Sequence, residues 1–121
     1  MTTNLSSVLI LEDNPLIAMD QESMLRKFEN LSVYLANSVA DAEQVLGNQR
    51  VDFALLDVEL QGETSEPIAS RLQAADIPFA FVSGYDDAGG MSVRFGDIPA
   101  LLKPLSETAL RDALITFGFV V

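Results

Sequence analysis

The chain contains no cysteine and no histidine among its 121 residues. Without cysteine it can form no disulfide, no thiol nucleophile and no thiolate zinc site. Without histidine it has no imidazole metal ligand and no Ser-His-Asp triad, and it cannot itself carry phosphohistidine. The ligands that remain are oxygen atoms, which favour Mg²⁺, Mn²⁺ or Ca²⁺ over softer metal ions.

Basic residues are also scarce, with 7 Lys and Arg against 18 Asp and Glu and a formal net charge of −11. Such a surface repels phosphate backbones and anionic lipids, so we expect no direct binding of nucleic acid or membrane. No apolar run approaches the roughly 20 residues of a membrane span. The first residues, MTTNLSS, show no basic segment ahead of an apolar stretch. We therefore expect a cytoplasmic protein.

The length predicts one domain, because folded domains usually have about 100–200 residues. Hydrophobic residues make up 49% of the chain, enough for one core. We expect a single domain over residues 1–121, with no output domain such as a DNA-binding module.

Short apolar runs recur along the chain and are typical of strands buried on both faces of a sheet. The runs are residues 8–11 (VLIL), 53–56 (FALL), 79–82 (FAFV) and 100–102 (ALL). Residues 32–35 (SVYL) are β-prone but more polar, which predicts a strand nearer an edge.

Between these runs, apolar residues follow a helical period. The predicted helices are residues 14–29, 38–47, 65–75 and 106–117. Asn14 and Ser38 are suited to N-caps, Pro15 to a first helical position, and Gly47 to a helix end. Residues 84–95 predict a fourth helix that is short or mobile, because glycine costs about 1 kcal/mol per helical position relative to alanine. This alternation predicts an α/β fold, a doubly wound parallel sheet with helices on both faces.

Polar residues stand where the predicted strands end, and in an open parallel sheet ligands bind at that edge. They are Glu12, Asp13, Asp57, Ser83 and Lys103. Each alone could be a solvated loop residue. Together the three carboxylates would repel one another, and a bound Mg²⁺ would offset that repulsion. An aspartate beside a metal and an ammonium group is suited to attack phosphorus and become an acyl phosphate.

These motifs resemble the receiver domain of bacterial two-component response regulators, over residues 6–118. Residues 78–85 (PFAFVSGY) also resemble the PFxFATGY signature of the FAT-GUY subclass, with Val82-Ser83 in place of Ala-Thr. The segments LEDNPLIAMD and LLDVELQGETS are similar to that subclass too. The resemblance implies a flavodoxin-like (βα)₅ fold with five parallel strands in the order 2-1-3-4-5.

The resemblance also implies roles for the strand-end residues. Asp57 would accept the phosphoryl group. Asp13, Asp57 and the backbone carbonyl of Glu59 would bind Mg²⁺ or Mn²⁺, and Glu12 would act mainly through water. Lys103 would pair with Asp57 or with its phosphate.

Three further expectations come from the same resemblance. Ser83 would donate a hydrogen bond to a phosphoryl oxygen, and the bond between Lys103 and Pro104 would be cis. The Glu59 side chain would either pair with Lys103 or repel a phosphodonor. Receivers usually carry an aromatic switch residue where this chain has Ala100, so Tyr85 or the fourth helix would do the switching.

The partner implied is a sensor histidine kinase or a histidine phosphotransfer protein, and the downstream protein is unknown. The chain would be a stand-alone phosphoacceptor that slowly dephosphorylates itself rather than an enzyme. The family usually binds partners through its fourth helix, fifth strand and fifth helix. Two alternatives are a receiver-like scaffold that needs no phosphorylation and a haloacid-dehalogenase-type hydrolase. The hydrolase is disfavoured because Glu59 stands where its second aspartate belongs.

Overall fold

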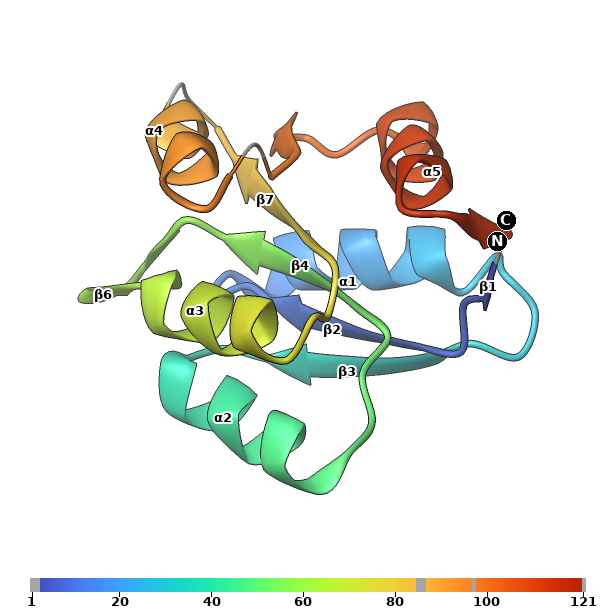
Figure 1. Ribbon diagram of the computed structural model, residues 1–121, viewed down its shortest axis with the longest axis horizontal. Helices are drawn as coiled ribbons and strands as arrows, with labels where there is room; N and C mark the ends of the chain where they lie inside the picture. Colours follow the sequence, from blue (N-terminus) through green and yellow to red (C-terminus); the bar gives the residue numbers. More distant parts are fainter. Residues whose placement is uncertain (1–2, 85–86, 97, 121) are drawn as a thin grey trace.

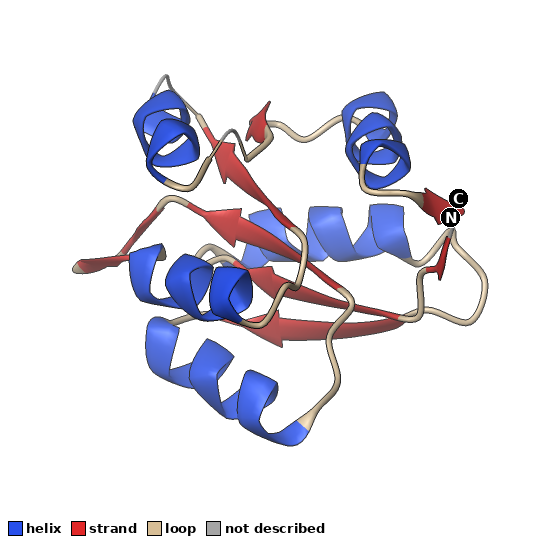
Figure 2. Cartoon of the chain, viewed as in Figure 1, coloured by secondary structure: helices blue, strands red, loops and turns tan. Residues whose placement is uncertain are grey.

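A five-stranded parallel sheet forms the centre of the molecule, with helices on both faces (Figures 1 and 2). The computed structural model describes residues 3–84, 87–96 and 98–120. The strands of this sheet are β2 (Ser7–Leu11), β3 (Ser32–Ala36), β4 (Phe53–Asp57), β7 (Phe79–Ser83) and β8 (Ala100–Leu102). The helices are α1 (Pro15–Leu25), α2 (Val39–Asn48), α3 (Glu66–Ala74), α4 (Asp87–Arg94) and α5 (Glu107–Thr116).

The strand order is β3-β2-β4-β7-β8. Numbered along the chain, these five strands have the predicted order 2-1-3-4-5, so the predicted fold is confirmed. The chain leaves β2 for β3 on one side and returns to β4 on the other. Leu11 near the end of β2 lies opposite Leu56 of β4, and Ser83 at the end of β7 lies opposite Leu102. The residues that follow these strands therefore meet at one edge of the sheet, beside the point where the order reverses.

The apolar strand residues alternate between two cores, one on each face of the sheet. Leu9 and Leu11 of β2 pack in the core covered by α2, α3 and α4. Val8 and Ile10 pack in the core covered by α1 and α5. Since both faces are covered, the strand sequences are apolar throughout, and each fully buried side chain of this size stabilises the fold by about 1.5–3 kcal/mol.

In the described part of the chain, side-chain caps are found at the start of three helices. The Oδ1 atom of Asn14 accepts hydrogen bonds from the backbone N–H groups of Leu16 and Ile17, and Pro15 is the first residue of α1. Ser38 caps α2 in the same way. Both predicted caps are confirmed, and Ser106 caps α5.

Two predicted helix ends are wrong. The first helix ends at Leu25 rather than at residue 29, because the amides of Lys27 and Phe28 bond three residues back and Asn30 adopts φ +57°. Gly47 lies inside α2, whose last residue is Asn48. Its φ is not in the left-handed region, so this glycine simply continues the helix at a modest cost.

Four short strands were not predicted from the sequence. Strand β1 (Thr3–Asn4) pairs in parallel with β9 (Phe119–Val120), which brings the two ends of the chain together. Strands β5 (Glu59–Leu60) and β6 (Glu63–Thr64) form an antiparallel hairpin just after β4. Two residues are too few for an alternating pattern to be visible in a sequence.

Helix α4 has eight residues and is the shortest of the described helices. Its C-terminal end is tied to α3: Gln73 Nε2 donates to the Phe95 carbonyl at 2.7 Å, and Arg94 pairs with Glu66. Tyr85, the predicted switch residue, lies outside the described residues. None of the helices in the described part of the chain has the length and apolar character required to cross a membrane.

Candidate functional site

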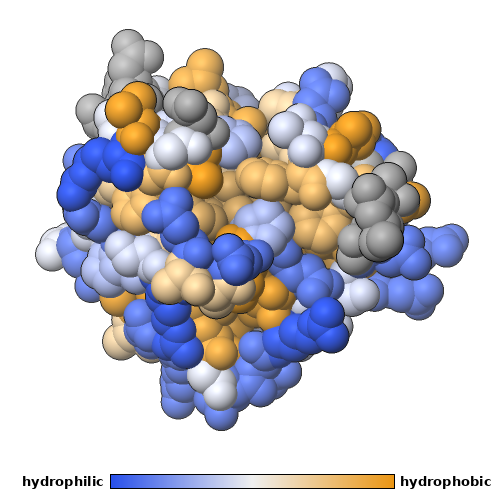
Figure 3. Space-filling model, in the orientation of Figure 1, coloured by the Kyte–Doolittle hydropathy of each residue, from blue (hydrophilic) through white to orange (hydrophobic). Residues whose placement is uncertain are grey.

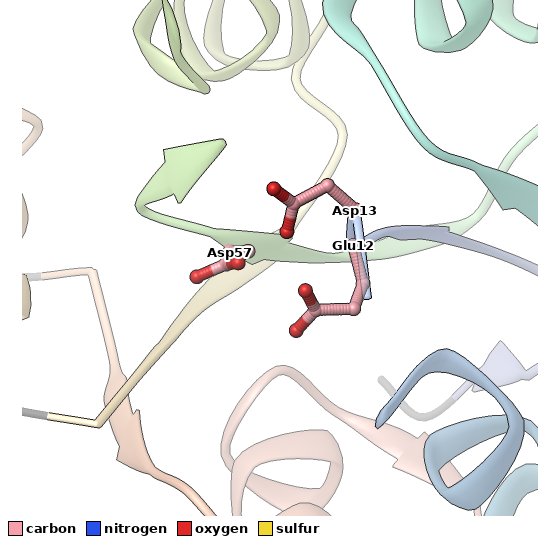
Figure 4. Close-up of side chains that lie close together, drawn as sticks. All are labelled: Glu12, Asp13 and Asp57. Atoms are coloured by element: carbon pink, nitrogen blue, oxygen red, sulfur yellow. The ribbon is translucent and has the colours of Figure 1, made fainter. Parts of the chain in front are cut away.

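Three carboxylates gather at the carboxyl edge of the sheet (Figure 4). Glu12 and Asp13 directly follow β2, and Asp57 is the last residue of the neighbouring strand β4. One oxygen atom of each lies within 4.8 Å of the others. Glu12 and Asp57 are only 3% and 7% exposed, and Asp13 is half-buried. Like charges this close and this buried are stabilised by a cation beside them or by protonation of one carboxylate.

Lys103 supplies one such cation from across the sheet. It directly follows β8, and its backbone N–H donates to the Ser83 carbonyl at 2.9 Å. Its Nζ atom lies 2.7 Å from Glu12 Oε1 and 3.2 Å from Asp57 Oδ2. One ammonium group thus bridges two carboxylates, as the sequence predicted for Asp57 but not for Glu12. With Asp13 counted, the site keeps an excess of negative charge.

The electrostatics of this cluster shift two pKa values. Burial raises the pKa of Glu12 to about 7, and the charge of Asp57 adds to that shift. The ion pair with Lys103 and the Asn14 backbone N–H, 3.1 Å from Glu12 Oε2, oppose it. Burial alone would lower the pKa of Lys103, but the two carboxylates outweigh burial and raise it. Lys103 is therefore charged at neutral pH, whereas Glu12 gains or loses its proton near neutral pH.

The donor set fits a hard divalent cation. Carboxylate oxygens are the ligands that Mg²⁺ prefers, and two or three of them suffice because Mg²⁺ keeps several waters. The uncompensated negative charge of the cluster would favour such an ion further.

The hairpin after β4 contacts this site in a way not predicted from the sequence. The backbone N–H of Gln61 donates to Asp13 Oδ2 at 2.9 Å. Glu59 in β5 is exposed, and the ion pairs of Lys103 among the described residues go to Glu12 and Asp57 instead. The predicted pairing of Glu59 with Lys103 is therefore not found. Its carbonyl as a metal ligand stays a prediction.

The remaining predicted residues lie around the same edge. Ser83 ends β7 and is 7% exposed, and its neighbour Val82 pairs with Asp57. The bond between Lys103 and Pro104 is cis, as predicted. Ala100 is exposed at the start of β8 and has no ring to swing inward.

Comparison with known proteins decides the family. Residues 8–115 match the family model of the response regulator receiver domain. The chain belongs to this family. Receiver domains of two-component systems bind Mg²⁺ at an acidic pocket and are phosphorylated by histidine kinases. In this receiver domain, the acidic cluster is formed by Glu12, Asp13 and Asp57.

Curated relatives include two longer regulators from Bacillus subtilis. The transcriptional regulatory protein MalR is 26% identical over 115 residues, which cover 88% of this chain and 49% of MalR. The sensory transduction protein LytT is 30% identical over 111 residues, which cover 88% of this chain and 46% of LytT. The receiver domain thus spans about half the length of these relatives.

Solved structures agree with the fold. The solution structure of SdrG from Sphingomonas melonis Fr1 is 38% identical, with a TM-score of 0.80, and the match covers 94% of this chain and 97% of SdrG. A response regulator receiver protein from Burkholderia phymatum has a TM-score of 0.82 at 22% identity, covering 95% of this chain and 97% of that one. The second likeness shows the fold alone.

Proposed function

We propose that this receiver domain accepts a phosphoryl group on Asp57 from a histidine kinase or a histidine phosphotransfer protein. The observation that supports this most is the placement of Lys103 Nζ, 3.2 Å from Asp57 Oδ2 inside a largely buried acidic cluster. A carboxylate in this setting can act as a nucleophile, with positive charge ready for the oxygens of the transferred group.

The transfer would proceed by attack of an Asp57 oxygen on the phosphorus of phosphohistidine. The new P–O bond forms as the P–N bond breaks, which leaves an acyl phosphate here and an imidazole on the donor. Asp13, Asp57 and the Glu59 backbone carbonyl would hold Mg²⁺, with Glu12 acting through water, and the bound cation would neutralise charge on the phosphoryl oxygens. Lys103 would move its ion pair from Asp57 to the phosphate.

Signalling would then depend on contact with a downstream protein. The Ser83 hydroxyl would donate to a phosphoryl oxygen and pull on the segment that follows β7. We propose that residues 1–121 form one receiver domain and that it acts in the cytoplasm. We also assign the chain to the FAT-GUY subclass, on the strength of residues 78–85 (PFAFVSGY).

Incubation with acetyl phosphate and MgCl₂ tests the proposal. The intact mass should increase by one phosphoryl group, and hydroxylamine should remove that group because it cleaves acyl phosphates. A chain that gains no phosphoryl group would be a phosphorylation-independent scaffold. A chain that hydrolyses phenyl phosphate with continuous turnover would instead be a hydrolase.

A further inference from the structure

The hairpin of β5 and β6 is a compact unit next to the acidic cluster. Leu60 lies opposite Glu63, so Gln61 and Gly62 form a two-residue turn between them. Gly62 has φ +78°, while Gln61 has a negative φ, which is the combination of a type II turn. Leu60 is buried in the core beneath α2 and α3, so the hairpin is held to the body of the molecule.

The turn directs one backbone N–H at the metal site. In a type II turn, the N–H of the first central residue takes no part in the turn's own hydrogen bond. In this hairpin that residue is Gln61, and its N–H donates to Asp13 Oδ2 at 2.9 Å. A backbone donor cannot rotate away as a side chain can, so it fixes the plane of the Asp13 carboxylate. Among the described residues, no hydrogen bond or ion pair engages the second oxygen, Oδ1, so it can take another partner.

A second contact anchors the hairpin on its other side. The Oε2 atom of Glu63 accepts a hydrogen bond from the backbone N–H of Val39 at 3.0 Å. Val39 is the first residue of α2, where the helix has unpaired N–H groups and a positive dipole end that favour a carboxylate. The hairpin therefore joins the N-terminus of α2 to the carboxylate of Asp13.

We infer that the β5–β6 hairpin is a positioning element for the metal site: the Gln61 N–H orients Asp13, and Glu63 anchors the hairpin to α2. This inference rests on the proposed function, in which Asp13 binds a divalent cation. A carboxylate already turned toward the ion loses less freedom on binding. Groups that hold metal ligands in place typically change metal affinity by about 10–100-fold when removed.

The variant Gln61→Pro removes the donor and preserves the turn. Proline is favoured at this turn position, and the residue before it, Leu60, is already in a strand, as a residue preceding proline prefers. Gln61→Ala is the matched control, because it removes the side chain and keeps the N–H. The readout is the binding constant for Mn²⁺, from the electron paramagnetic resonance signal of the free ion, with the melting temperature in EDTA measured alongside.

We expect Gln61→Pro to bind Mn²⁺ about tenfold more weakly or worse, and Gln61→Ala to bind it like the parent. The melting temperature of the proline variant in EDTA should be equal to that of the parent or higher, because proline restricts the unfolded chain. A purely structural role would produce the opposite pattern, a lower melting temperature with unchanged affinity. That pattern would overturn the inference.

Glu63 provides a second test that does not depend on proline. Glu63→Ala should weaken Mn²⁺ binding several-fold, and Glu63→Gln should restore most of it, because the amide oxygen still accepts from Val39. Equal affinity in the parent, Gln61→Pro and Glu63→Ala would overturn the inference, as would tighter binding through a freed Asp13 oxygen. If the parent binds no Mn²⁺, the proposed metal site fails and the inference fails with it.

Discussion

Glu12 is the most deeply buried carboxylate of the site, and its surroundings shift its pKa in opposite directions. Burial and the nearby Asp57 raise its pKa to about 7, while Lys103 at 2.7 Å favours the charged form. A bound divalent cation would add a second positive charge and favour ionisation. The charge of Glu12 near neutral pH therefore depends on what the site holds.

The metal-free protein should consequently lose stability as the pH rises through about 7. The folded-state pKa of Glu12 lies above its ordinary value of 4.5, so the folded state binds this proton more tightly than the unfolded state does. The stability from this group is fully present below about 4.5 and is lost as the pH rises through about 7. Glu12→Gln should flatten this dependence in denaturant titrations with EDTA.

The exposed residue Glu59 offers the control. Glu59→Gln should keep the pH dependence of the parent, because its carboxylate is outside the buried pair. If Glu12→Gln and the parent lose stability equally across this pH range, Glu12 is not the group that titrates there.

Within the candidate site, side-chain contacts were predicted only where strand topology brings the residues together. Glu12, Asp13, Asp57 and Lys103 each follow or end a strand, so a parallel sheet brings them together whatever their conformations. The bridge from Lys103 to Glu12 depends on how a long side chain is oriented past β7 and β4, and no pattern in the sequence encodes that. The Gln61 contact depends on a backbone amide, which every residue but proline carries.

At the scale of elements, α4 is the helix to which the switching hypothesis applies. It has eight residues and is tied to α3 at its C-terminal end, through Gln73 and Arg94. Because Ala100 has no aromatic ring, our hypothesis is that switching works through ordering of residues 84–95, with Ser83 pulling on the head of that segment. This hypothesis stays a prediction.

Gly90→Ala tests it. Gly90 lies in α4, its φ is outside the left-handed region, and an added Cβ meets no atom within 4 Å. Alanine should therefore raise the free energy of unfolding by about 0.5–1 kcal/mol. In the unphosphorylated protein it should also reduce microsecond–millisecond exchange of the α4 amides, measured by NMR relaxation dispersion.

Gly47→Ala in α2 is the matched control, since Gly47 is equally unobstructed. It should stabilise the protein by a similar amount and leave the exchange in α4 unchanged. The hypothesis of switching by ordering of residues 84–95 is refuted if the α4 amides show no exchange in the parent. It is also refuted if Gly90→Ala and Gly47→Ala show the same exchange.

The pattern of apolar residues predicted the main elements because burial on both faces imposes it. Where a long apolar pattern is missing, prediction failed. Gly47 is exposed within α2. The two-residue strands are too short to show a pattern: β5 pairs with the nearby β6, and β1 pairs with β9 at the other end of the chain. The end of α1 was misplaced because Phe28 continues the apolar period beyond Leu25, where the helical hydrogen bonds stop.

At the scale of the whole molecule, three of the exposed large apolar side chains lie on α4, β8 and α5. In Figure 3, hydrophobic and hydrophilic colours alternate over the upper half of the view, where α4, β8 and α5 lie in Figure 1. Val93, Leu102 and Ile115 are 72%, 65% and 59% exposed on these three elements. The face formed by α4, β8 and α5 stays our prediction for the contact with a downstream protein.

The net charge of −11 means that any salt should stabilise the fold somewhat, so the metal effect must be measured against matched ionic strength. MgCl₂ should raise the melting temperature more than NaCl does, because an ion that binds only the folded state adds about 2.7 kcal/mol at 100 times its dissociation constant. Asp13→Asn should be more stable than the parent without metal and should lose most of the extra response. An unchanged response would place the ion elsewhere.

Phosphoryl labelling of Asp57 tests the central claim most directly. The parent, Asp57→Asn and the control Asp112→Asn, an exposed aspartate on α5, are incubated with acetyl phosphate and Mg²⁺ and weighed by intact mass spectrometry. We predict one added phosphoryl group on the parent and on Asp112→Asn, and none on Asp57→Asn. Equal labelling of Asp57→Asn would contradict the account, because the group would then be carried by another residue.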